Sequence, residues 1–310
     1  MAIRDRVTNL TGGRPPAAIE ITPDGVLAAM RPAAGKRGSA EADNALVYAF
    51  TPLPPGALIA GIEEPNLRAP EVVAEAIRSA LDQVSPRTSA VTLVLPDVLV
   101  RVFVLDFDAL PAKAEEAIPV IRFRLRKMVP FDVEHAGVSY QVLSQGKAEY
   151  KVLTAIIPGP ILAEYEAAVR AAGYEPGAVL PSSLAALETA DPMEAVLAAN
   201  VNQQAMTTLI SNGQDLLLYR TLDLPSEITG RVAEMQRGIA VAAAYYEDKL
   251  GAPPRKLHYT GNLDIEEFAA WLQLPQLTIV ELAPRPSSGM MTSLGNESIA
   301  GVAGALAGAS

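Results

Sequence analysis

Cysteine is absent from the 310-residue chain. Its absence excludes disulfide bonds, thiol catalysis and metal sites built from thiolates, and it is compatible with a reducing compartment. Histidine is scarce as well, with His135 and His258 the only two. Neither has carboxylates at the spacing of a recognisable site, so we expect structural or solvated roles for both.

Long apolar runs and excess positive charge are also lacking. No stretch approaches the roughly 20 apolar residues that a membrane-spanning helix requires. The first residues, MAIRDRVTNLTGG, carry charges where a signal peptide has an apolar core, and we expect a cytoplasmic protein. The net charge of −10 argues against nucleic-acid binding, which needs Lys and Arg to neutralise phosphates.

The common catalytic motifs are missing too. The chain has no Walker A sequence, no Gly-x-Ser-x-Gly elbow and no His-Glu-x-x-His. Gly301, Gly304 and Gly308 recur in the short apolar segment Ile299–Ala309 without a dinucleotide pattern, which favours a closely packed helix. We therefore expect no catalytic residue, no metal and no cofactor.

What is present is a globular composition with a repeated order of elements. Half of the residues are hydrophobic and 19% are charged, and the length favours two domains. Each half contains three antiparallel strands, a helix and a further strand. In the first half these are Ala17–Ile21, Gly25–Met30, Ala45–Thr51, a helix from Pro70, and Ala90–Leu95. In the second half they are Ala195–Val201, Ala205–Ser211, Asp215–Leu222, a helix capped by Ser226 and running to Leu250, and Lys256–Tyr259. The repetition predicts an α/β protein with a duplicated ribonuclease-H-like fold.

A different pattern lies between the halves. A basic helix is predicted to end at Pro130, with an apolar stripe formed by Ile118, Ile121, Leu125 and Met128. Strands follow around Val138–Val142 and at Tyr150–Ile157. The basic face of the helix comprises Arg122, Arg124, Arg126 and Lys127. Solvated charge is one interpretation of this face, and contact with anionic lipid headgroups or an acidic partner is the other.

The order of several short motifs resembles the PilM family of actin-like proteins in type IV pilus assembly, and more distantly FtsA and the cytoplasmic part of GspL. The motifs are Val129-Pro130-Phe131, Tyr140-Gln141-Val142, Ala171-Ala172-Gly173-Tyr174 and Leu218-Tyr219-Arg220. The resemblance implies an actin-like fold. Its parts would be a flexible arm (1–16), domain 1A (17–97), an inserted 1C-like subdomain (98–158), a helix and crossover completing domain 1 (159–189), and domain 2 with a shortened or absent subdomain 2B (190–310).

The departures from that family concern the nucleotide loops. Where the family has Asp-Ile-Gly in each hairpin, this chain has Glu20-Ile21-Thr22, followed by Pro23 and Asp24, and then Asn200-Val201-Asn202. A phosphate cradle needs close backbone approach and free N–H donors, which threonine and proline oppose. The adenosine-side Gly-Gly turn reads Gly261-Asn262. We therefore expect a degenerate nucleotide site.

As the resemblance implies, the preferred hypothesis is a non-catalytic pilus scaffold peripheral to the inner membrane. It would bind the cytoplasmic N-terminal segment of a PilN-like membrane protein by strand addition, in a groove between the first domain and the inserted subdomain. The predicted lining is Val100, Val102, Phe103, Phe123, Val129, Pro130 and Phe131. The alternatives are an actin-like ATPase, with Glu20 and Asp24 near a metal, and a scaffold of type II secretion. Self-association into rings or filaments is a further possibility.

Overall fold

The computed structural model describes residues 14–32, 46–63, 65–146, 149–283 and 297–307. The described chain forms two compact units. Unit I contains residues 14–96, 163–189 and 297–307, and unit II contains 97–162 and 190–282. Most of the expected arm (1–16) lies outside the described residues.

Unit I is built on a five-stranded sheet in the order β3-β2-β1-β4-β8. Its strands are β1 (Ala17–Ile21), β2 (Gly25–Met30), β3 (Val47–Pro52), β4 (Ala90–Leu95) and β8 (Glu175–Pro181). The first three pair antiparallel, whereas β4 runs parallel to β1 and to β8. All five residues of β1 are buried, as expected of a central strand covered on both faces.

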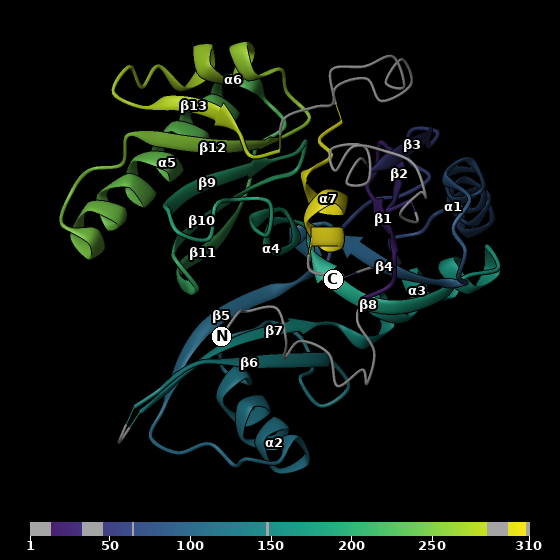
Figure 1. Cartoon of the computed structure of the whole chain (residues 1–310), viewed down its shortest axis with the longest axis horizontal. Coiled ribbons are helices and arrows are strands. Elements are labelled where there is room, and N and C mark those ends of the chain that lie inside the picture. The colour runs from purple at the N-terminus through teal and green to yellow at the C-terminus, as the bar shows by residue number, and fades with distance from the viewer. Residues whose placement is uncertain (1–13, 33–45, 64, 147–148, 284–296, 308–310) are drawn as a thin grey trace, which may run out of the picture. The chain divides into compact units, whose positions relative to one another are not determined.

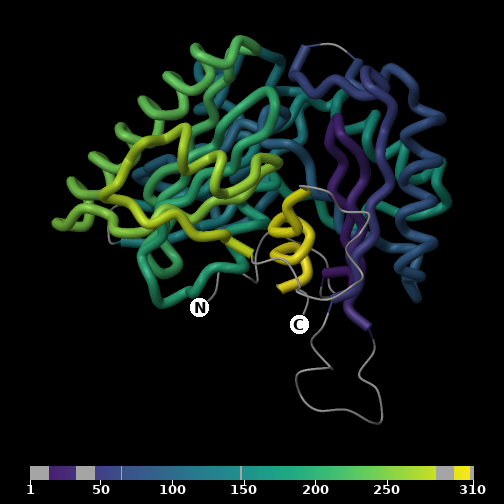
Figure 2. The backbone as a smooth tube through the Cα atoms, turned by 90° about the horizontal axis from the view of Figure 1, so that it is seen from above, coloured from purple at the N-terminus to yellow at the C-terminus, as the bar shows by residue number. Residues whose placement is uncertain are grey.

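Helices cover both faces of this sheet. They are α1 (Pro70–Val84), α4 (Ser182–Leu187), α7 (Ala300–Ala307) and most of α3 (Gly159–Ala171). Proline opens α1, as the sequence predicts, and the side chains of Val73, Ile77 and Leu81 are fully buried on one helical stripe. Figures 1 and 2 show β1 and β2 between α1 and the yellow α7.

Unit II contains a second five-stranded sheet in the order β11-β10-β9-β12-β13. Its strands are β9 (Ala195–Val201), β10 (Ala205–Asn212), β11 (Asp215–Asp223), β12 (Lys256–Gly261) and β13 (Thr278–Glu281). Three antiparallel strands are again followed by two parallel ones, so the duplication predicted from the sequence is confirmed. Helices α5 (Ile228–Leu250) and α6 (Ile265–Leu272) pack on this sheet.

The start of α5 differs from the sequence prediction. Ser226 was the predicted N-cap, but the cap is Glu227, whose carboxylate accepts hydrogen bonds from the backbone N–H groups of Thr229 and Gly230. Serine is a commoner N-cap residue than glutamate, so N-cap preference favoured Ser226 over the adjacent Glu227. The predicted end of the helix is confirmed, because Gly251 adopts a left-handed conformation at the C-terminus.

Unit II also contains a three-stranded antiparallel sheet in the order β5-β7-β6, with α2 on one face (Figure 1). The elements are a short 3₁₀ turn η3 (Asp97–Leu99), β5 (Arg101–Phe107), α2 (Ala114–Leu125), β6 (Gly137–Gln145) and β7 (Tyr150–Ile157). Helix α2 buries Ala117, Ile121 and Leu125. It ends before the predicted stop at Pro130, and Met128 is 41% exposed, so the predicted stripe was wrong at its last member. The chain turns at this point because the following loop packs Val133 into the same core.

Candidate functional site

The tip of the β1–β2 hairpin uses its own hydrogen-bond donors. The backbone N–H of Thr22 donates to the Gly25 carbonyl at 2.9 Å, and the N–H of Gly25 donates back to the Thr22 carbonyl at 3.2 Å. The Thr22 hydroxyl also donates to the Gly25 carbonyl, at 3.2 Å. Pro23 has no N–H. Of the four residues from Thr22 to Gly25, two therefore have N–H groups that are bonded inside the turn, and Pro23 has no N–H to offer a phosphate.

Glu20 lies two residues before Thr22 and is buried. The hydroxyl of Ser182, the first residue of α4, donates to Oε1 of Glu20 at 2.6 Å. Gly301 in the first turn of α7 packs so closely that a methyl group there would overlap the Glu20 carboxylate. The carboxylate therefore lies against the N-terminal turns of two helices within unit I, where helix dipoles favour a negative charge.

The side chain of Asn202 closes the turn between β9 and β10. Oδ1 of Asn202 accepts hydrogen bonds from the backbone N–H groups of Gln204, at 2.9 Å, and of Ala205, at 2.8 Å. The N–H of Asn202 donates to the Ala205 carbonyl at 3.0 Å. A glycine at this position would leave two backbone donors at the tip for a phosphate, whereas asparagine occupies both of them.

Asn200, at the end of β9, belongs to a buried network that the sequence did not reveal. Its amide donates to Oδ2 of Asp97 at 3.2 Å, and the hydroxyl of Tyr219 donates to Oδ1 of the same carboxylate at 2.6 Å. Asp97 is only 2% exposed. All three residues lie in unit II, so the network ties η3, where the chain enters this unit, to the β9–β11 sheet.

The Gly261-Asn262 turn packs back onto the end of β9. The N–H of Asn262 donates to the Val201 carbonyl at 3.2 Å. Gly261 has φ +154, and a side chain there would overlap the same carbonyl. The glycine is therefore explained by close backbone approach within the sheet.

The described residues contain neither a cluster of metal-ligating side chains nor a membrane-spanning helix. Among the described residues, no group of three or more histidine, aspartate or glutamate side chains is arranged to hold a metal ion. In the same part of the chain, no helix is both long enough and apolar enough to cross a membrane.

The residues predicted to line a partner groove differ in burial and lie on different faces. Phe103, Val129 and Phe131 are partly buried and pack on one core under α2. Val102 is buried and, as the neighbour of Phe103 in β5, points to the opposite face of the sheet. Val100 is buried between η3 and β5, and Pro130 is exposed. Phe123 is 75% exposed on the outer side of α2.

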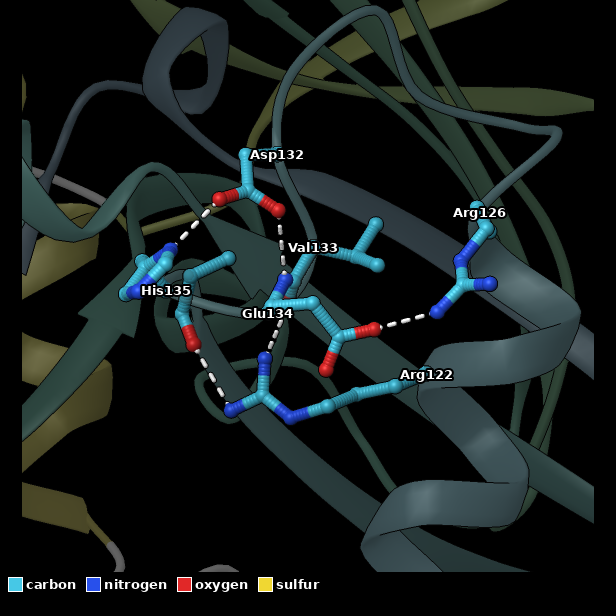
Figure 3. Close-up of polar contacts among 7 residues, drawn as sticks. Arg122, Arg126, Asp132, Val133, Glu134 and His135 are labelled. Carbon is cyan, nitrogen blue, oxygen red and sulfur yellow. Dashed lines mark hydrogen bonds and ion pairs between the residues drawn. The ribbon is translucent and has the colours of Figure 1, made fainter.

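The four cations of the predicted basic face also differ in their contacts. Figure 3 shows two of them, Arg122 and Arg126. The Arg122 guanidinium donates to the Val133 carbonyl and, at 2.9 Å, to the Ala136 carbonyl, so this side chain holds the loop that follows α2. Arg126 forms an exposed ion pair with Glu134. Arg124 and Lys127 are exposed, and no described carboxylate lies within ion-pair distance of either.

The two histidines occupy different environments. His135 is exposed and hydrogen-bonds Asp132, which raises the pKa of the imidazole and lowers the pKa of the carboxyl. His258 in β12 is half-buried, and burial lowers its pKa. Structural or solvated roles for the two histidines remain a prediction.

The arrangement of helices and strands is similar to that of known structures. A chain of the "PilM-PilN type IV pilus biogenesis complex" superposes with a TM-score of 0.73 at 18% identity, covering 95% of this chain and 98% of that one. The fold is actin-like. The two sheets of identical strand order are the duplicated halves of this actin-like fold, as the sequence resemblance implies.

Other actin-like neighbours are more distant. The cytoplasmic domain of EpsL, an inner-membrane component of the type II secretion system of Vibrio cholerae, is 15% identical, with 90% of this chain and 92% of that chain covered and a TM-score of 0.49. A Bacteroides thetaiotaomicron protein of actin-like ATPase fold is 12% identical, with 85% and 90% covered and a TM-score of 0.48. No protein-family model and no curated protein sequence matches the chain.

Proposed function

We propose that the chain is a non-catalytic scaffold of type IV pilus assembly that binds the cytoplasmic N-terminal segment of a PilN-like inner-membrane protein. The observation that carries this proposal is the likeness to the chain from the PilM–PilN complex over 95% of the present chain. Binding such a segment would place the protein in the cytoplasm, at the periphery of the inner membrane.

The proposed absence of catalysis follows from the hairpin tips. Backbone N–H groups that could bind a triphosphate are already bonded in both hairpins, those of Thr22 and Gly25 to each other's carbonyls and those of Gln204 and Ala205 to the Asn202 side chain. Asn200 also offers a neutral amide where a metal-supporting carboxylate is expected. These contacts support a degenerate nucleotide site with no cofactor.

The proposed domain division assigns 17–97 and 159–189 to domain 1, 98–158 to an inserted 1C-like subdomain, and 190–310 to domain 2. The small sheet with α2 has a hydrophobic core of its own, which supports an inserted subdomain. Strand β11 ends at Asp223 and α5 begins at Ile228, so four residues stand where a long helical subdomain 2B would be inserted. This short link supports a reduced 2B.

Strand addition to β6 is the binding mode that we propose. Among the described strands β6 pairs only with β7, so the other edge of its nine residues is available for backbone hydrogen bonds. Strand β5, the opposite edge, lies beside β11 within unit II. The half-buried Val138, Tyr140 and Val142 of β6 lie on the face that shares a core with Phe103, Val129 and Phe131. A bound peptide would extend this apolar face.

Isothermal titration calorimetry with a PilN-like N-terminal peptide tests the function, and hydrogen exchange locates the site. We expect binding, with slower amide exchange at 137–145 in the presence of peptide. Strand β13, the edge strand of the other sheet in unit II, is the internal control and should be unaffected. Absence of binding to the PilN-like peptide contradicts the scaffold proposal. Protection at β13 alone contradicts the proposed site.

The ATPase alternative is tested separately. A ligand at 100 times its Kd stabilises a protein by roughly 2.7 kcal/mol, which a thermal shift detects readily. We expect no shift of the melting temperature with millimolar Mg-ATP. A shift that requires Mg²⁺ would show that the altered hairpins still bind nucleotide.

A further inference from the structure

Helix α2 and the turn after it form a basic stretch in an acidic chain. Between Ala117 and Phe131 there are four cations and no carboxylate, although the whole chain has 35 acidic residues. Arg122 and Arg126 are engaged by the loop that follows α2 (Figure 3). Arg124 and Lys127 are exposed, and no described carboxylate lies within ion-pair distance of either. These two cations can therefore bind an anion outside the chain.

Exposed apolar side chains accompany the two cations. Phe123 is 75% exposed, and Val120, one turn before it, is 38% exposed. Arg124 follows Val120 by four residues and Lys127 follows Phe123 by four, so each apolar side chain has a cation one turn further along the chain. We call these four residues the α2 patch. Because exposed apolar surface is unfavourable in water, the patch suits a ligand that has both an anionic and an apolar part.

Most carboxylates close to the α2 patch already have a partner. Of the four carboxylates within residues 113–135, three do: Glu116 pairs with Lys113, Glu134 pairs with Arg126, and Asp132 hydrogen-bonds His135. The fourth, Glu115, precedes Phe123 by eight residues, which is about 12 Å along a helix axis. Exposed charges that far apart are largely screened in 0.1 M salt, where the Debye length is about 10 Å. At short range the unpaired cations therefore dominate the field of the patch.

We propose that the α2 patch contacts anionic lipid headgroups at the membrane surface, with the side chains of Val120 and Phe123 inserted among them. The inference rests on the proposed function for its location, because a PilN-like segment would hold the chain beside the inner membrane. The cytoplasmic leaflet of a membrane carries anionic lipids that attract Lys and Arg. Tethering raises the effective concentration of these headgroups around the patch, so a contact that is weak alone still orients the tethered chain.

The form of the patch favours a lipid surface over an acidic protein. The net charge of −10 opposes approach to both and does not distinguish them. Val120 and Phe123 project from the exposed side of a helix, and the fluid boundary between headgroups and acyl chains accepts such side chains without a preformed pocket. An acidic protein would need a pocket shaped to Phe123. Arg and Lys also suit this boundary, because their apolar stems lie beside the inserted groups while their charged ends reach the headgroups.

Flotation of the full chain with vesicles, without any peptide, tests the cations. The vesicles contain phosphatidylcholine alone, or phosphatidylglycerol and phosphatidylcholine in equal parts. We expect flotation at low salt with the anionic vesicles only, and release at high salt. R124A/K127A should lower the partition coefficient by roughly fivefold per cation, the equivalent of about 1 kcal/mol each. R220A/R255A is the matched control, since it removes two exposed cations of the same unit outside the patch and changes the net charge equally.

The apolar part of the patch is tested in the same assay. Phe123→Ala should weaken partitioning into anionic vesicles by roughly tenfold, because an inserted aromatic ring loses its burial. Ile228→Ala is the control, since Ile228 is 64% exposed on α5 of the same unit and lies outside the patch. Phe123 belongs to the predicted lining of the peptide groove, so peptide binding is not used to judge this variant.

Four results would overturn the lipid contact. They are a wild-type chain that does not float with the anionic vesicles at low salt, equal losses in R124A/K127A and R220A/R255A, equal losses in Phe123→Ala and Ile228→Ala, and R124A/K127A that floats normally but binds the PilN-like peptide more weakly. The last result would assign the patch to a protein interface. Failure of the wild-type chain to bind the peptide contradicts the proposed function instead, and it is distinguishable because flotation is measured without peptide.

Discussion

Gly304 in α7 is a position where helix propensity and close packing predict opposite effects of a mutation to alanine. Alanine is more favourable than glycine by about 1 kcal/mol in a helix interior. At Gly304, however, an added methyl group would overlap the backbone carbonyl of Ala185 in α4. A backbone carbonyl cannot rotate away as a side chain can, so Gly304→Ala has to move α7 as a whole.

The magnitude follows from what α7 buries. Overpacking that shifts a helix costs about 1–3 kcal/mol. If α7 undocks instead, the fully buried Val302 and Leu306 lose their burial, at about 1.5–3 kcal/mol each. Subtracting the propensity gain of about 1 kcal/mol leaves a cost of up to about 2 kcal/mol if α7 shifts and of about 2–5 kcal/mol if it undocks, so we expect Gly304→Ala to destabilise unit I. Gly301→Ala should cost less, because it meets the Glu20 side chain and not backbone.

Urea unfolding followed by two probes measures this effect. Trp271, the only tryptophan, lies in α6 of unit II, whereas far-UV circular dichroism reports both units. The circular dichroism midpoint should therefore fall more than the fluorescence midpoint. Gly230→Ala in α5 is the control, since its nearest neighbours lie at 3.4 Å or beyond and allow the propensity gain. The reasoning is refuted if Gly304→Ala is as stable as the wild type or more stable.

Three other mutations test the polar contacts. Arg122→Ala should loosen the loop after α2 by removing donors from two carbonyls, seen as faster hydrogen exchange at 129–136, whereas Arg124→Ala should not. Tyr219→Phe removes a hydrogen bond to a buried carboxylate and should cost about 1.5–3 kcal/mol in urea unfolding, and Tyr245→Phe should be near neutral. Glu227→Gln should lower the melting temperature near neutral pH. Backbone hydrogen bonds lower the pKa of the Glu227 carboxyl, so its stabilisation is present above the ordinary pKa near 4.5 and is lost as the pH falls through the folded value. The difference between the variant and wild type should therefore shrink in acid, and a constant difference contradicts this assignment.

The duplicated sheets could be predicted from the sequence because their signals are local. Pro-Asp-Gly and Asn-Gly turns lie between short, largely apolar segments, and one helix in each half has an apolar stripe. Strand β5 was not predicted, because Val98–Leu105 is apolar apart from Arg101 and has no turn signal to separate η3 from the strand. The end of α2 depends on the packing of Val133 from the next loop, which no local propensity reports.

The polar networks could not be predicted because their members are far apart in the chain. Asp97 is separated from Asn200 by 103 residues and from Tyr219 by 122, and Glu20 is separated from Ser182 by 162. The only sequence signal was an aspartate directly after the proline that ends β4, inside an otherwise apolar segment. An acidic residue in such a run needs a partner, but the sequence does not say which.

The two hairpin tips show why a departure from a phosphate-binding sequence is easier to predict than the contacts made in its place. Proline lacks an N–H and threonine carries a Cβ, so single residues suffice to predict that a phosphate cradle is impaired. The structure adds the contacts that these residues make: Asn202 closes its own turn, and Asn200 binds Asp97. A glycine at position 202 would therefore remove a turn-stabilising acceptor while leaving Asn200 engaged. The hairpin tips form hydrogen bonds within their own units, and these contacts support the proposal that the chain acts as a scaffold through its surfaces.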